Sequence, residues 1–90
     1  MSVKISIPSG LQHITREQEV VEVNGSTVGE CLNHLARQFP GIEKELLDED
    51  GKVFQYVDIY VNGESSYPEE LAKPVKDGDE LYMLRAVAGG

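Results

Sequence analysis

Residues 57–63, VDIYVNG, carry the strongest strand signal in the chain. Val57, Ile59 and Val61 alternate with polar or aromatic residues, a period of two that is typical of a strand with one buried face. The Asn62-Gly63 pair that follows is a favoured turn sequence. The stretch therefore predicts a half-buried strand that ends in a tight turn.

Two further strands are expected near the N-terminus. Apolar side chains alternate with polar ones over residues 3–7, and Pro8-Ser9-Gly10 then supplies turn residues. Residues 19–23 form a second stretch rich in valine, which Asn24-Gly25 closes. These two strands are expected to pair as a hairpin with a long loop.

The segment between these strands and the central one predicts the main helix, over residues 28–38. Thr27 and Glu30 have the spacing of a capping box, and Pro40-Gly41 ends the pattern. The apolar side chains of one face recur at helical spacing: Val28, Cys31, Leu32, Leu35 and Phe39.

The rest of the chain predicts a short helical turn and a last strand. Residues 42–47 can form one turn whose apolar side chains point inward, namely Ile42, Leu46 and Leu47. In residues 80–85, Leu81 and Met83 alternate with their neighbours. The expected fold is α+β: one domain over residues 1–85, with a mixed four- to five-stranded sheet and one main helix packed across it.

The composition limits the classes of function that this chain can have. The chain has 90 residues, enough for one domain, and 16 acidic against 8 basic side chains give a formal net charge of −8. Such a surface repels phosphate backbones, so nucleic acid is not an expected partner. A single cysteine excludes an intrachain disulfide, and no apolar run has signal-peptide or membrane-spanning length. A cytoplasmic protein with no membrane partner is expected.

The last five residues, AVAGG at 86–90, predict a flexible tail. Gly89 and Gly90 have no side chains and the largest backbone freedom of any pair. Five extended residues span about 17 Å, enough to reach into the active site of another protein. A frayed terminus is the alternative interpretation of two glycines alone.

Several short motifs occur in a characteristic order along the chain. They are Ser6-Ile7-Pro8, Thr27-Val28-Gly29, Pro40-Gly41-Ile42, residues 57–62, Asp77-Gly78-Asp79 and the AVAGG ending. On these motifs, nearly the whole chain resembles the ubiquitin-like β-grasp sulfur carriers, a family that includes ThiS, MoaD and CysO. Tyr60-Val61-Asn62 and the AVAGG ending are most similar to the CysO-like branch.

The resemblance implies that the Gly90 carboxylate, preceded by Gly89, is the reacting group. In this family an E1-like enzyme uses ATP to adenylate the carboxylate, and a sulfur donor then displaces AMP to leave a thiocarboxylate. ATP and Mg²⁺ are expected to bind to that partner, because Gly51-Lys52 lacks the glycine spacing and the following hydroxyl residue of a phosphate loop. The chain is thus expected to be a carrier that binds no cofactor, and not an enzyme. With no residue after Gly90, no trimming is expected.

The resemblance also implies partners. One is the E1-like adenylating enzyme, and the other is a sulfur-accepting synthase similar to cysteine synthase or to the large subunit of molybdopterin synthase. A metalloprotease that releases the product remains open. Cysteine is the first expected product, molybdopterin the next, and thiamine is less favoured.

The alternation of the strands predicts a docking surface. If Leu81 and Met83 point into the core, then Tyr82 and Leu84 lie on the open face of the sheet, where Tyr60 and Asp58 also project. An aromatic and aliphatic patch beside a mobile tail suits docking to the activating enzyme. Scattered surface apolar residues are equally compatible with this pattern.

The segment between the last strand and the glycines belongs to the same predicted surface. Arg85 either pairs with an acidic groove of the partner, which is the favoured interpretation, or simply ends the strand. Ala86, Val87 and Ala88 are expected to contact the partner as the extended lead-in to Gly89.

The other side chains of reactive types are expected to have structural roles. Cys31, on the apolar stripe of the helix, is expected to fill the core. Glu30 and His34 lie one helical turn apart, but a solvated pair is favoured over a metal site, and no metal is expected. Two rival functions stay open: a protein modifier that joins lysines through Gly90, and a binding module that never reacts.

Overall fold

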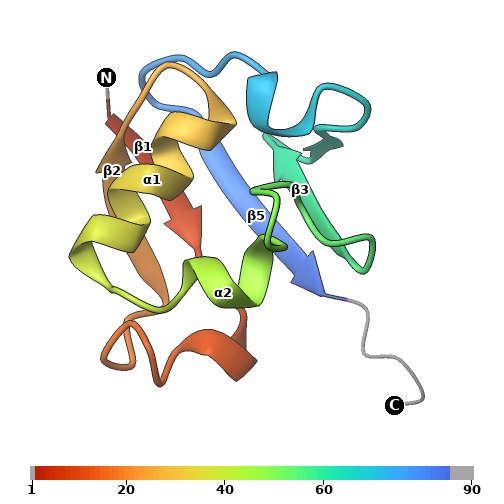
Figure 1. Cartoon of the computed structure of the whole chain (residues 1–90). Coiled ribbons are helices and arrows are strands. Elements are labelled where there is room, and N and C mark those ends of the chain that lie inside the picture. The colour runs from red at the N-terminus through yellow and green to blue at the C-terminus, as the bar shows by residue number, and fades with distance from the viewer. Residues whose placement is uncertain (1, 86–90) are drawn as a thin grey trace.

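The computed structural model describes residues 2–85 (Figure 1). Its elements follow in chain order as β1 Ser2–Ser6, β2 Val20–Asn24, α1 Val28–Gln38, α2 Glu43–Leu46, β3 Val57–Val61, β4 Glu64–Ser65 and β5 Glu80–Arg85, with short 3₁₀ turns η1 Ser9–Leu11 and η2 Glu70–Ala72. No helix in this part of the chain is long and apolar enough to cross a membrane.

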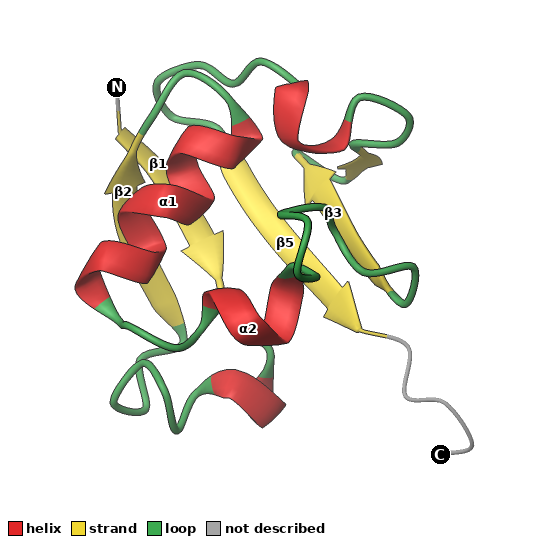
Figure 2. Ribbon diagram, viewed as in Figure 1, coloured by secondary structure: helices red, strands yellow, loops and turns green. Residues whose placement is uncertain are grey.

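The five strands form one mixed sheet in the order β2-β1-β5-β3-β4. β1 and β5 run parallel at the centre, and the other pairs are antiparallel. The helices α1 and α2 lie on one face of this sheet (Figure 2). The predicted α+β fold, with one main helix across a mixed sheet, is confirmed.

The predicted elements agree closely with the observed ones. α1, β3 and β5 have the predicted bounds, whereas β1 and β2 are each shifted by one residue. The predicted hairpin of β1 and β2 forms, and the Ile7 N–H donates to the Glu19 carbonyl 2.8 Å away just beyond the ends of these strands. β4 has only two residues, too few to show a period of two.

Thr27 caps α1 as predicted, and its side chain accepts a hydrogen bond from the Glu30 N–H at 3.1 Å. The second half of the predicted capping box is different. The Glu30 carboxylate accepts from the backbone N–H and the hydroxyl of Ser26, at 2.8 and 2.7 Å. Ser26 offers two donors at one position, so the carboxylate bonds one residue earlier than a standard capping box requires.

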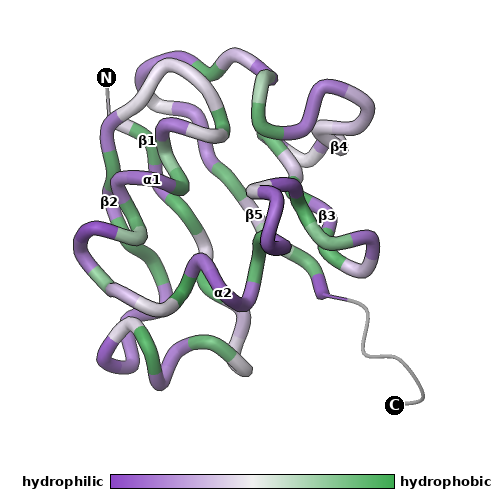
Figure 3. Tube along the Cα trace, in the orientation of Figure 1, coloured by the Kyte–Doolittle hydropathy of each residue, from purple (hydrophilic) through white to green (hydrophobic). Residues whose placement is uncertain are grey.

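One hydrophobic core lies between the sheet and the helices. Figure 3 shows that hydrophobic and hydrophilic residues are interspersed along the strands and helices. The predicted face of α1 is buried throughout, including Cys31 and Phe39. In β3 and β5 every second side chain points into this core, as the alternation predicts. Leu81 and Met83 are each only 1% exposed.

The segment after α1 follows its prediction. Gly41 has a φ of +104°, which ends the helical path after Pro40, and Leu46 of α2 is buried as expected. Leu47, predicted to point inward, is half-buried and packs against the core. It follows α2 in an extended conformation and forms a bridge with Val53.

Candidate functional site

The face of the sheet away from the helices carries an apolar patch. Tyr60 and Tyr82 are directly opposite each other on β3 and β5, and Leu84 is opposite Asp58 one step further along. Tyr82 is 51% and Leu84 44% exposed, and Tyr60 is half-buried. The sheet therefore brings together the three predicted docking side chains Tyr60, Tyr82 and Leu84, called here the open-face patch.

Val20 is an apolar residue of this face that the sequence reasoning missed. It pairs with Ser6, which in turn pairs with Tyr82, so Val20 lies in the same row of the sheet as the two tyrosines. Its side chain is 51% exposed. The signal was present in the sequence, because Val21 and Val23 point inward and strand alternation then turns Val20 outward.

Arg85 lies apart from the open-face patch. It shares the side of β5 with Leu81 and Met83, and its Nη1 atom is 3.3 Å from Glu45 Oε1 of α2. The guanidinium group thus forms an ion pair within the chain on the helical side of the sheet. Its predicted pairing with a partner groove stays a prediction.

The predicted reacting residues Gly89 and Gly90, with the lead-in Ala86, Val87 and Ala88, lie outside the described residues. The described chain does fix where this segment begins. Arg85 is opposite Val57, at the end of the central strand β5 and beside the first residue of β3 (Figure 1). The C-terminal segment therefore leaves the described chain at this end of the sheet.

Cys31 has the properties of a core residue. Its side chain is fully buried against the other apolar residues of α1. Burial disfavours the thiolate and raises the pKa of Cys31 to about 11, and the nearby carboxylate of Glu30 acts in the same direction. A thiol with this pKa is not a nucleophile at neutral pH. The prediction that Cys31 fills the core is confirmed.

Glu30 and His34 are each engaged in local structure. His34 Nδ1 accepts a hydrogen bond from the Asn24 N–H at 2.7 Å, which ties α1 to the edge strand β2. The hydrogen bonds from Ser26 lower the pKa of Glu30, since they stabilise its ionised form. Within residues 2–85 no three histidine, cysteine or acidic side chains are grouped to hold a metal ion.

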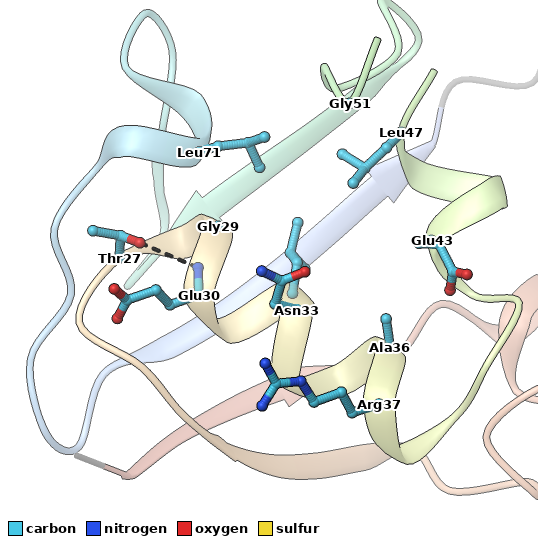
Figure 4. A pocket seen from close by; sticks show the side chains of 11 residues that line it. Thr27, Gly29, Glu30, Asn33, Ala36, Arg37, Glu43, Leu47, Gly51 and Leu71 are labelled. Atoms are coloured by element: carbon cyan, nitrogen blue, oxygen red, sulfur yellow. Dashed lines mark hydrogen bonds between the residues drawn. The ribbon is translucent and has the colours of Figure 1, made fainter. Parts of the chain in front are cut away.

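A groove of about 630 Å³ runs along the outer side of α1 (Figure 4). Thr27 and Leu71 lie near one end, and Leu47 faces α1 from across the groove. The charged side chains on its rim are of both signs, Glu30, Arg37 and Glu43. The groove combines an apolar floor with mixed charges, and none of the predicted site residues lines it.

Comparisons with known proteins agree with this architecture. The family model described as the ThiS family matches residues 5–90. Sulfur carrier protein CysO of Mycobacterium tuberculosis is 39% identical over 93 residues, which cover 100% of each chain. A chain in the crystal structure of the Amycolatopsis orientalis BexX/CysO complex is 38% identical, with a TM-score of 0.90 over 98% of this chain and 99% of that chain.

Small archaeal modifier protein 1 of Haloferax volcanii is also similar, at 32% identity over 71 residues and 78% of each chain. These relatives share the β-grasp fold that the motifs predicted, and the full-length similarity to CysO proteins agrees with the CysO-like branch. The family match begins within β1 and covers the rest of the sheet, both helices and the Gly-Gly ending. This protein therefore belongs to the ThiS family of ubiquitin-like β-grasp sulfur carriers.

Proposed function

We propose that this protein carries sulfur as a thiocarboxylate on Gly90. The observation that supports this most directly is the family match through residue 90, where the chain ends in Gly-Gly. Similarity over the whole length to sulfur carrier protein CysO points the same way. The protein acts in this proposal as a co-substrate in the cytoplasm, and the catalysis belongs to its partners.

The chemistry explains why a partner with ATP is needed. A carboxylate is a poor electrophile, so an E1-like enzyme first transfers AMP from ATP to the Gly90 carboxylate, with Mg²⁺ and release of pyrophosphate. A sulfur nucleophile then attacks the acyl carbon, and AMP leaves with the bonding electrons. The resulting thiocarboxylate carries sulfur that is nucleophilic, and a synthase uses it. ATP and Mg²⁺ are bound by the activating enzyme.

Cysteine is the product that we favour. Its support is the similarity to CysO proteins in sequence and in structure, at 39% and 38% identity. The sulfur would pass to an activated serine derivative held by a cysteine synthase-like enzyme, and a metalloprotease would release the product if it stays joined to the carrier. Molybdopterin is the next candidate and thiamine the last.

The open-face patch and the start of the tail form the proposed docking surface. Tyr82 and Leu84 expose apolar area on the side of the sheet that the helices leave uncovered. Arg85 and residues 86–88 follow directly and lead to the reacting glycine. A CysO protein has been crystallised as a complex with BexX, which supports assembly of this kind of carrier with a partner protein.

A second candidate function is protein modification. Small archaeal modifier protein 1 is 32% identical to this chain, and this similarity supports protein modification as the second candidate function. The same activated Gly90 would then form an isopeptide bond with a lysine of a target protein. Proteomic detection of lysines that carry a Gly-Gly remnant from this chain would support the modifier function.

The test of the carrier function is intact mass spectrometry after incubation with ATP, a sulfide source and the activating enzyme of the same organism. We expect the mass to rise by the difference between sulfur and oxygen. A variant that lacks Gly90 should keep its fold, checked by circular dichroism, and gain no sulfur. Loading of the deletion variant, or no loading of the intact protein by an enzyme active on another carrier, would contradict the proposal.

A further inference from the structure

A pocket of about 340 Å³ opens at the outer edge of β3. Its walls come from the segment just before β3, from the first two residues of β3, from Tyr67 after β4 and from the start of η2. The side chains that the argument uses are Val53, Phe54, Val57, Asp58, Tyr67 and Glu70. None of them belongs to the open-face patch, and the proposed function gives this pocket no role.

The lining has the composition of a site for a cationic side chain. Its charged groups are the carboxylates of Asp58 and Glu70, and two aromatic rings, Phe54 and Tyr67, stand beside them. Aromatic faces attract cations, and planar guanidinium groups also stack on them. Val53 and Val57 add apolar wall that suits the methylene stem of a long basic residue.

Hydrogen bonds and stacking hold the Asp58 carboxylate and the Phe54 ring before any ligand arrives, whereas the Tyr67 side chain is 74% exposed. The Ser65 hydroxyl donates to both Asp58 carboxylate oxygens, at 3.0 and 3.2 Å, and accepts from the Tyr67 N–H at 3.2 Å. Ser65 thereby links one carboxylate to the backbone beneath the Tyr67 ring. On the other wall, the Phe54 ring stacks on Tyr56 with centroids 4.9 Å apart. A site arranged in advance loses less entropy when it binds.

The pocket also lies next to the place where the C-terminal segment begins. Val57, in the pocket wall, is opposite Arg85, and Asp58 is opposite Leu84 of the open-face patch. Neighbouring strands are about 4.8 Å apart, so a protein that binds the patch and takes up the tail also passes this pocket. The charge is complementary to a basic residue, since the chain has a net charge of −8.

We propose that this pocket receives an arginine side chain of the protein that activates the C-terminus. The guanidinium group lies between the Asp58 and Glu70 carboxylates and against the ring of Tyr67, and it anchors the partner beside the tail. The identity of the partner rests on the proposed carrier function, whereas the preference for arginine rests on the pocket alone.

The first experiment tests the pocket without any partner enzyme. The ¹⁵N-labelled full chain is titrated with Nα-acetyl-arginine methylamide and followed by NMR, with the D58N/E70Q variant and an E17Q/E19Q control. D58N keeps an oxygen that accepts from Ser65, and the control removes two exposed carboxylates in the loop before β2. We expect saturable shifts at residues 53–58 and 65–70 that are lost in D58N/E70Q and kept in the control. Equal shifts over the whole acidic surface, or shifts unchanged in D58N/E70Q, would overturn the proposal.

The second experiment measures kcat/KM for sulfur loading of the same three proteins. We expect a loss of about tenfold for D58N/E70Q, the scale of one charge-assisted hydrogen bond, and no loss for the control. Equal kcat/KM for all three proteins would overturn the assignment to the activating partner. If the wild-type chain cannot be loaded at all, the carrier function fails, and the arginine titration still decides whether the pocket binds this side chain.

Discussion

Ionisation of Glu30, at the start of α1, makes the stability of the fold depend on pH. Hydrogen bonds from Ser26 lower its pKa in the folded protein below the ordinary value of 4.5. A carboxyl group with a lowered folded pKa stabilises the fold above its unfolded pKa, and this contribution is lost as the pH falls through the folded pKa. We therefore expect stability to decrease as the pH falls below about 4.5.

The measurement is the urea midpoint across this pH range for the wild type and for E30Q. E30Q keeps an acceptor oxygen but cannot ionise, so its midpoint should fall less steeply with acid. The pKa of Asp79 is also lowered, by hydrogen bonds from Asn62 and Lys76, so part of the acid dependence should survive in E30Q. Identical curves for the two proteins would show that Glu30 contributes nothing to the acid dependence of stability.

Arg85 can form its ion pair within the chain or with a partner protein. Its ion pair with Glu45 is partly exposed on both sides, at 28% and 45%, and pairs of this kind contribute less than about 1 kcal/mol. A partner carboxylate can therefore replace Glu45 at small cost. We expect R85Q to lower kcat/KM for sulfur loading and E45Q to leave it unchanged. Equal losses in both variants would instead assign the effect to the internal pair.

At single residues, sequence patterns predicted local contacts but not contacts between distant positions. The role of Thr27 as the cap was predictable, because its partner is the backbone of a residue three positions away. Likewise, the apolar stripe of α1 placed Cys31 correctly in the core. The ion pair of Arg85 with Glu45 was not predictable, since it joins residues 40 positions apart, and periodicity carries no information about that contact.

At the scale of elements, close backbone approach makes Gly25 sensitive to substitution. A Cβ atom at Gly25 would lie 2.8 Å from the Cys31 N atom and 2.9 Å from its Sγ atom, at the start of α1. The helix would have to shift, so we expect G25A to destabilise the protein by about 1–3 kcal/mol. G10A is the matched control, because a Cβ atom there meets nothing within 4 Å. Urea denaturation of both variants tests this, and equal midpoints would contradict it.

Elements with a strong periodic signal were predicted well, and those without one were not. α1, β3 and β5 expose one face and bury the other over at least five residues, so their bounds follow from the sequence. The two residues of β4 are defined only by pairing with β3 across the Asn62-Gly63 turn. The pocket at the edge of β3 combines Asp58 of that strand with Tyr67 and Glu70 from the chain after β4, and no periodic pattern predicts that these residues lie together.

At the scale of the whole molecule, the two ends of the described chain meet in the centre of the sheet. β1 and β5 pair in parallel, with Ile5 opposite Leu81, although 76 positions separate these residues in the printed sequence (81 − 5). Local alternation predicted both strands, the order of the elements predicted that they would share one small mixed sheet, and the motif resemblance identified that sheet as a β-grasp. This pairing places β5 at the centre of the sheet, and Arg85 ends this central strand opposite Val57 of β3.

The last prediction follows from the two faces of that central strand. Met83 is 1% exposed and points into the core, whereas its neighbour Leu84 is 44% exposed and belongs to the open-face patch. M83A should lose roughly 2–5 kcal/mol of unfolding free energy, because it leaves a cavity in the core. L84S removes exposed surface, so it should change stability by less than about 0.5 kcal/mol and yet lower kcat/KM for sulfur loading. Urea denaturation and a loading assay on both variants separate folding from docking, and L84S with normal loading would remove Leu84 from the docking surface.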